Sequence, residues 1–202
     1  MMRSSLVCRS TLAPGGTVPT DQAGVNNAVT ELSTIAEGYF DRYRYPDWLR
    51  RHSLVVGAIA TSLAEAHIAA GADLDGRAVS LGGYLHDIGK SPLVAGDARD
   101  HNVLGPLILA AEGLAELAEL SRRHPVYAPR DPATAPRTLG EKIVYYADRR
   151  GGQSVVTLEE RIDEQLARWP QLAHLRAEDL AFAKSVEADV FRGISLRPAD
   201  LA

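Results

Sequence analysis

Apolar residues recur along most of the chain at the three- and four-residue spacing of amphipathic helices. The first such stretch, residues 26–40, predicts a helix with one apolar face. Pro46 suits the first turn of a second helix, and Gly71 stops that helix. Asp75 can cap a third helix, which is expected to end at Asp87–Gly89.

The second half of the chain continues in helices that glycine and proline separate. Further helices are predicted over residues 101–112, 114–123, 139–150, 157–169 and 177–191. Pro125 ends the second of these, because the residue before a proline avoids the helical region. The helix over 139–150 is apolar nearly all round, which indicates burial. With no persuasive strand, repeat or second-domain linker, the pattern predicts an all-α fold, a compact bundle of about seven or eight helices.

The two ends of the chain lack this periodicity. Residues 1–25 are rich in Ser, Thr, Pro and Gly and are expected to form a flexible N-terminal tail. Residues 193–202 are expected to form a C-terminal tail, which leaves a single domain over 26–192. The start lacks the apolar segment of a secretion signal, and no apolar run approaches the roughly 20 residues of a membrane span. We therefore expect a cytoplasmic protein without a membrane partner.

The composition excludes several classes of protein. The 202 residues are 46% hydrophobic and carry a net charge of −4 with no run of Lys and Arg, so we expect no nucleic-acid partner. The one cysteine, Cys8, excludes an intrachain disulfide and a cysteine-ligated zinc or iron–sulfur site. An anionic ligand would therefore have to be held by local cations or by a metal.

Candidate metal ligands occur where predicted helices begin and end. His86 and Asp87 are adjacent at the end of an apolar run; both can reach one cation, and the aspartate has a second oxygen for another. His52 lies on an apolar stripe and so points inward. His101 and His124 flank two helical runs of about 16 Å each, and a hairpin between the runs would return both histidines to the same end.

A further candidate, Asp148, lies near the end of the helix that is expected to be buried. A carboxylate there is costly unless it is paired or bound to metal, and an ion pair with Arg149, Arg150 or Arg122 is the alternative. Four histidines and two aspartates on different helices form a plausible two-metal site of nitrogen and oxygen donors. His67, about 22 Å along the helix from His52, cannot share that metal and is expected to be structural, like His174.

In this order the residues resemble the HD superfamily of metal-dependent phosphohydrolases in its two-metal form. The resemblance covers about residues 45–168 and rests on the segments 51–54, 85–90, 100–105 and 141–150. Within this superfamily, the chain resembles small bacterial HD proteins, among them symmetrical diadenosine tetraphosphate hydrolases. The chain lacks the Gly-Tyr-Pro signature of cyclic di-GMP phosphodiesterases and the Glu-Asp pair that follows His-Asp in guanosine tetraphosphate hydrolases. Those two substrates are therefore disfavoured.

The resemblance implies a role for each candidate residue. Four would bind a first metal: His52, His86, Asp87 and Asp148. Asp87 would bridge to a second metal, completed by His101 and His124. The cofactor would be two divalent transition metals, iron first, with manganese, cobalt, zinc or nickel as alternatives.

The implied reaction is hydrolysis of a phosphomonoester or phosphoanhydride, of a nucleotide in particular, by a metal-bridging hydroxide. Asp87 and Lys90 are the expected catalytic residues. Lys90 follows Gly89, a glycine expected to turn the chain, and would contact phosphate together with Arg149 and Arg150, although each of these cations could instead be a solvated surface residue.

Two other functions remain open at this point. Some HD proteins with this ligand set are di-iron oxygenases that cleave C–C or C–P bonds, and the ligands alone do not separate the two chemistries. A non-catalytic nucleotide-binding or regulatory protein is the third possibility, which an intact ligand set argues against. The chain is expected to act as a monomer or homodimer.

Overall fold

The computed structural model describes residues 22–127 and 130–201, with side chains from residue 29 onward. Most of the expected N-terminal tail lies outside the described residues. The described part contains no β-strand and eight α-helices: α1 (Gln22–Arg42), α2 (Asp47–Ala69), α3 (Gly76–Leu85), α4 (His101–Ala111), α5 (Ala118–Arg122), α6 (Leu139–Arg150), α7 (Leu158–Arg168) and α8 (Arg176–Val190). The predicted all-α bundle is confirmed. None of the described helices is long and apolar enough to cross a membrane.

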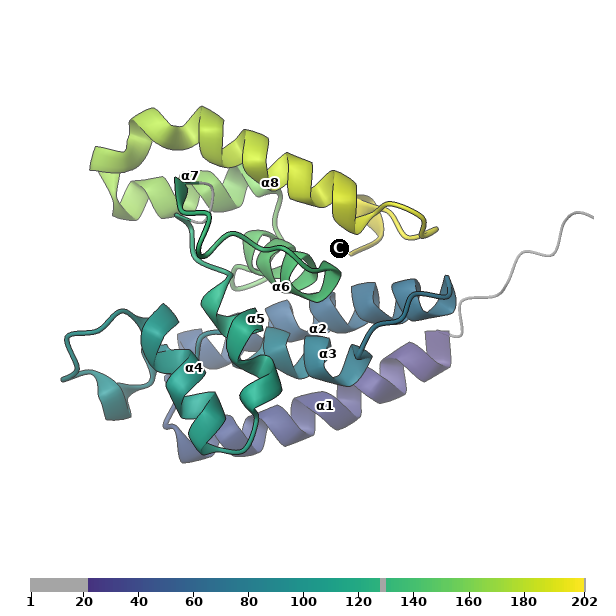
Figure 1. Ribbon diagram of the computed structural model, residues 1–202, viewed down its shortest axis with the longest axis horizontal. Helices are drawn as coiled ribbons and strands as arrows, with labels where there is room; N and C mark the ends of the chain where they lie inside the picture. Colours follow the sequence, from purple (N-terminus) through teal and green to yellow (C-terminus); the bar gives the residue numbers. More distant parts are fainter. Residues whose placement is uncertain (1–21, 128–129, 202) are drawn as a thin grey trace, which may run out of the picture.

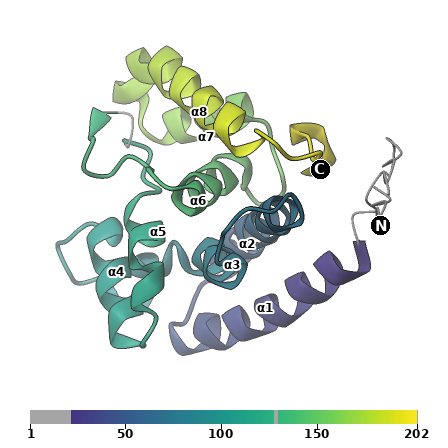
Figure 2. The same cartoon turned by 45° about the vertical axis from the view of Figure 1, so that its right-hand side comes forward.

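Helix α6 lies at the centre of the bundle. It packs against α2 and α3 on one side and against α7 and α8 on the other (Figures 1 and 2). Ten of its twelve residues are buried, among them Val144, Tyr145 and Tyr146, which confirms the prediction made from its apolar surface. Of the remaining helices, α1 packs against α2 and α3, and α4 and α5 pack against each other beside α3. Residues near the end of α6 are therefore held rigidly in the interior.

Local signals in the sequence fix several helix ends. Thr138 and Glu141 form a capping box at the start of α6, and Thr157 and Glu160 form another at the start of α7. Gly71 has a φ of +90°, a conformation that glycine adopts without strain, and it ends α2 as expected. These caps satisfy backbone groups that the helices leave unpaired.

Gly89 has a different role from the one predicted. It does not have positive φ, so it does not provide a left-handed turn. Helix α3 ends at Leu85, and Gly89 lies in a short 3-10 helix, η1 (Ile88–Lys90), pressed against the start of α4. A Cβ at residue 89 would lie 2.2 Å from the backbone oxygen of His101 and 2.8 Å from the backbone nitrogen of Gly105. Glycine is required here because two backbones approach closely.

Two further helix predictions differ from the structure. Helix α1 begins at Gln22, four residues earlier than expected. The helix expected over 114–123 is a 3-10 turn, η3 (Ala115–Leu117), followed by the short α5. Residues of the expected C-terminal tail contact the domain: Leu196 and Leu201 pack against the core, and Arg150 donates a hydrogen bond to the Pro198 carbonyl over 3.2 Å.

Candidate metal centre

The structure brings all six candidate ligands together. They come from separate segments of the chain: His52 from α2, His86 and Asp87 from the junction of α3 and η1, His101 from the first turn of α4, His124 from the loop after α5, and Asp148 from α6. Five of the six are buried, and His101 is partly exposed. Each histidine directs its Nε2 atom at a carboxylate of the group.

Asp87 lies in the middle of the group. Its Oδ2 atom is 3.5 Å from His52 Nε2 and 3.4 Å from His86 Nε2. Its Oδ1 atom is 3.2 Å from His124 Nε2 and 3.6 Å from His101 Nε2, yet it accepts no well-aligned hydrogen bond although it is fully buried. A buried carboxylate oxygen without a hydrogen-bond partner is explained where it ligates an ion.

The donor atoms fall into three overlapping groups, each small enough to hold a metal ion. Within each group the donors lie within 4.8 Å of one another: His52, His86 and Asp87; His86, His124 and Asp148; Asp87, His101 and His124. Imidazole nitrogen and carboxylate oxygen without sulfur suit iron, manganese, cobalt, nickel or zinc. The residues present therefore fit a transition-metal site.

Backbone carbonyls orient two of the imidazoles. His86 Nδ1 lies 2.8 Å from the Gly83 carbonyl, and His124 Nδ1 lies 2.5 Å from the Ser121 carbonyl. A proton on Nδ1 donates to each carbonyl and leaves Nε2 unprotonated toward the carboxylates, which is the tautomer that a metal requires. The Ser121 hydroxyl in turn donates to the His86 carbonyl over 2.8 Å, so the two histidine segments are tied together.

The pKa shifts of four candidate ligands suit a metal, whereas that of His52 does not: burial would lower its pKa, but the hydrogen bonds and charges of Asp148 and Asp87 raise it. Burial lowers the pKa of His86, and it lowers that of His101 to about 4, so both imidazoles are neutral. Burial alone would raise the pKa of Asp87, but Lys90 and the surrounding histidines outweigh it and hold this pKa well below its usual range. Arg149 and His52 likewise keep the pKa of Asp148 well below its usual range, against the effect of burial. Neutral imidazoles and ionised carboxylates are the metal-binding forms.

Two buried arginines hold Asp148 in place. Arg149 donates to Asp148 Oδ2 over 2.5 Å, to the His124 carbonyl over 3.1 Å, and to Gln165 Oε1 over 2.7 Å. Arg161 lies 3.4 Å from Asp148 Oδ1 and also donates to the Asp148 carbonyl. The ion pair considered from the sequence is therefore present, and it coexists with a carboxylate that still faces His52 at 3.3 Å. Arg149 links a ligand on α6 to a ligand segment after α5.

Arg149→Met should loosen this arrangement. The change keeps the apolar stem but removes the donor to Asp148 Oδ2, Gln165 Oε1 and the His124 carbonyl, while Arg161 still contacts Asp148 Oδ1. We expect metal affinity to fall by about 10- to 100-fold, as is typical when groups that orient metal ligands are lost. The free energy of unfolding should fall by about 2–4 kcal/mol. Metal titration and urea denaturation of the same preparation measure both effects.

Arg150→Met is the matched control. Arg150 donates to the Val156 carbonyl, the Tyr146 hydroxyl and the Pro198 carbonyl, all away from the donor group. The Arg150→Met substitution should destabilise the fold and leave metal affinity unchanged. Equal losses of metal affinity in the two variants would contradict the role given to Arg149.

The three cations expected to contact substrate occupy different positions. Lys90 lies at the edge of the site, and its Nζ is 2.7 Å from Asp87 Oδ2. Arg149 lines the adjoining pocket but is buried, and its two terminal nitrogens donate to protein groups. Arg150 is buried against α8 and the C-terminal segment and does not line that pocket, so its bonds give it a structural role. Of the other two histidines, His67 is buried, 2.7 Å from the Val190 carbonyl, and His174 is exposed on η5 (Pro170–Leu175).

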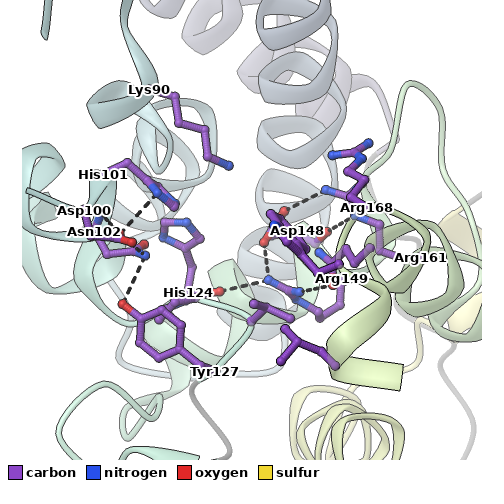
Figure 3. A pocket seen from close by; sticks show the side chains of 15 residues that line it. Lys90, Asp100, His101, Asn102, His124, Tyr127, Asp148, Arg149, Arg161 and Arg168 are labelled. Atoms are coloured by element: carbon purple, nitrogen blue, oxygen red, sulfur yellow. Dashed lines mark hydrogen bonds and ion pairs between the residues drawn. The ribbon is translucent and has the colours of Figure 1, made fainter. Parts of the chain in front are cut away.

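A pocket of about 250 Å³ opens beside the donor group. Figure 3 shows Lys90 and His101 on one side of it, and Arg149, Arg161 and Arg168 on the other. The lining is completed by polar and apolar side chains: Asp100, Asn102, His124, Pro125, Val126, Tyr127, Asp148, Gln165, Trp169 and Leu172. The pocket thus carries four cationic side chains in a protein whose net charge is negative.

Several residues of this pocket were not among the sequence candidates. Arg161, Gln165, Arg168 and Trp169 recur at helical spacing along α7 and just beyond it, and this spacing was the signal that could have placed them on one face. Tyr127 comes from the proline-rich loop after α5, where sequence periodicity carries no information.

Comparison with known proteins agrees with this geometry. Residues 49–150 match the model of the HD domain, and this segment contains all six candidate ligands. No curated protein and no solved structure matches the chain significantly. The matched segment is half of the chain and carries the donor group. The chain therefore belongs to the HD domain family, whose members are generally metal-dependent phosphohydrolases.

Proposed function

We propose that the protein hydrolyses a phosphomonoester or phosphoanhydride of a nucleotide with the help of two divalent transition metals. The observation that carries this proposal is the position of Asp87, whose two oxygens face different pairs of histidines. His52, His86 and Asp148 would hold the first metal, His101 and His124 the second, and Asp87 both. When bound, such a pair supplies an acidified water as nucleophile and stabilises charge on the phosphoryl oxygens.

The side chains of the pocket suit a phosphorylated substrate. Lys90 lies beside Asp87, where it can bind a non-bridging phosphoryl oxygen as a point charge. Arg149 and Arg161 are committed to Asp148 and so orient a ligand rather than contact substrate. His52, His86, His124, Asp87 and Asp148 are buried, and the low dielectric of a buried site strengthens polar interactions there. The choice of a nucleotide as substrate is our proposal from the resemblance of the sequence motifs alone.

Metal removal and replacement test the proposed reaction. Protein freed of metal with a chelator should release no phosphate, and activity should return with about two equivalents of iron, manganese or cobalt per chain. The substrate panel is diadenosine tetraphosphate, whose symmetrical hydrolysis yields two ADP and is followed by nucleotide chromatography, and nucleoside diphosphates and monophosphates, whose hydrolysis is followed by phosphate release. Oxygen uptake is followed in parallel, because an oxygenase would consume oxygen whereas a hydrolase would not. Phosphate release that is unaffected by metal removal would refute the proposal.

Lys90→Ala should weaken substrate binding and turnover without loss of metal. The lysine pairs with Asp87 in the structure, and its removal relieves competition for that carboxylate, so metal content should be unchanged or higher. Loss of a charge-assisted hydrogen bond to phosphate should cost about 1.5–3 kcal/mol in kcat/KM. Lys90→Arg should recover only part of this. Steady-state kinetics and metal analysis on the same samples test this prediction. Unchanged kinetics in Lys90→Ala would show that Lys90 does not contact the phosphate.

A further inference from the structure

One wall of the pocket lies outside the segment that matches the family. The match ends at residue 150, whereas Arg161, Gln165, Arg168, Trp169 and Leu172 line the pocket from α7 and η5. The candidate ligands thus lie within the family segment, whereas this wall comes from the C-terminal part of the chain beyond it. A pocket wall that is supplied separately from the reactive centre is well placed to select the substrate.

The sequence of α7 places the residues of this wall on the side of the helix that faces the pocket. Leu158 and Ile162 are buried on the core side of the helix, and the pocket residues recur on another side at helical spacing. Pro170 ends the helix at Trp169, which has φ −130° and ψ 70°, because the residue before a proline avoids the helical region. Trp169 is left 43% exposed at the edge of the pocket. Trp169 is thus an aromatic side chain that lines the pocket and is partly open to solvent.

A chain of ion pairs connects this wall to the donor group. Arg161 contacts Asp148 and also donates to Glu164 over 2.7 Å. The other carboxylate oxygen of Glu164 pairs with Arg168. Arg168 remains more than half exposed, so its guanidinium can exchange the solvated Glu164 carboxylate for an anion at little cost. Among the arginines that line the described pocket, Arg168 is the one that is not buried.

We propose that Arg168 and Trp169 form the recognition site for the part of a nucleotide that is not cleaved. Arg168 binds a phosphate next to the reacting one through two parallel hydrogen bonds, and the indole of Trp169 stacks on the base. Tyr127, which lines the pocket from the loop after α5, offers a second aromatic surface. This inference rests on the proposed phosphohydrolase function and assigns its substrate specificity to the wall formed by α7 and η5.

The two tryptophans of the chain allow a direct binding test. Trp48 is on α2, is 51% exposed and does not line the pocket. In Trp48→Phe the fluorescence comes from Trp169 alone, and in Trp169→Phe it comes from Trp48 alone. The probes are α,β-methylene-ADP, which resists hydrolysis, and methylenediphosphonate, which has the same two phosphonate groups and no base. Both are titrated into protein purified with its metals.

The expected result is saturable quenching of Trp48→Phe by α,β-methylene-ADP, little quenching by methylenediphosphonate, and none in Trp169→Phe. Trp169→Leu should bind α,β-methylene-ADP roughly tenfold more weakly by calorimetry, as expected for a lost base stack. Arg168→Ala should weaken both probes by about tenfold. Arg176→Ala is the matched control, because Arg176 is also paired with an α7 carboxylate, Asp163, but lies outside the pocket lining.

Quenching that persists in Trp169→Phe, absence of any quenching, or equal affinities in Arg168→Ala and Arg176→Ala would overturn the recognition site. These results do not depend on turnover. If wild-type protein hydrolyses nucleotides while the tryptophan and arginine variants behave like the control, the recognition site is wrong and the phosphohydrolase function stands. If the variants behave as expected and no phosphate is released, the proposed reaction is wrong.

Discussion

Asp87→Ala should lose both metal ions and all metal-dependent phosphate release. Asp87 is the one residue among the six candidate ligands whose side chain reaches both pairs of histidines, at 3.2 to 3.6 Å. Without it, two groups of imidazoles remain with no shared anion between them, and the positive charge of two metals is poorly balanced. Elemental analysis of the purified variant should find well below one metal per chain, and phosphate release should fall to background.

Asp97→Ala is the control for removal of a carboxylate near the site. Asp97 lies in the loop before α4 and pairs with Arg99, and neither residue lines the pocket. This variant should keep wild-type metal content and turnover. Asp87→Ala is expected to remain folded, because most of the stability of the bundle comes from its apolar core, so circular dichroism should be unchanged. An Asp87→Ala protein that retains one tightly bound metal and measurable turnover would contradict a bridging role.

The convergence of the six candidate ligands could be predicted because each sits at a position that the sequence marks. His52 lies on an apolar stripe, His101 opens a helix, and His124 and His86 close helical runs, so periodicity and helix ends indicate which side chains turn inward. The buried setting of Asp148 followed in the same way from the apolar surface of α6. Apolar periodicity and helix ends are local signals in the sequence, and the formation and burial of each helix depend on them directly.

The surroundings of the donors could not be predicted in the same way. Arg149 and Arg150 are neighbours in the sequence, but successive residues on a helix point roughly 100° apart, so one binds Asp148 and the other binds the C-terminal segment. Which of them faces the site depends on how α6 is rotated against α7 and α8, and that is a property of tertiary packing. Arg161 and Gln165 meet Arg149 and Asp148 only because α7 folds back over α6.

The role of Gly89 also could not be predicted, because a glycine can have several structural roles that the sequence alone does not distinguish. A glycine after His-Asp was expected to turn the chain, whereas the structure gives it a contact between η1 and the start of α4. This contact holds His86 and Asp87 beside His101. The two roles predict different effects of substituting Gly89. A glycine in a turn could be replaced with small rearrangements of the chain, whereas a glycine at a close contact between two backbones could not.

Gly89→Ala should therefore be strongly destabilising and should weaken the metal centre. The new Cβ would lie 2.2 Å from the His101 carbonyl oxygen and 2.8 Å from the Gly105 nitrogen, and backbone atoms cannot rotate away as a flexible side chain can. Separation of η1 from α4 is the remaining way to relieve the overlap. We expect the free energy of unfolding of metal-free protein to fall by about 3 kcal/mol, at the upper end for overpacking. Urea denaturation measures this.

The same movement carries His101 away from Asp87, so the site formed by Asp87, His101 and His124 should lose metal before the site formed with His52. Titration of Gly89→Ala with a transition metal should then show one tight equivalent in place of two. Gly96→Ala is the control, because a Cβ at residue 96 meets no atom within 4 Å, and its unfolding free energy should stay within about 0.5 kcal/mol of wild type. If Gly89→Ala matched Gly96→Ala in both stability and metal stoichiometry, the close contact between η1 and α4 would not be what aligns the two halves of the donor group.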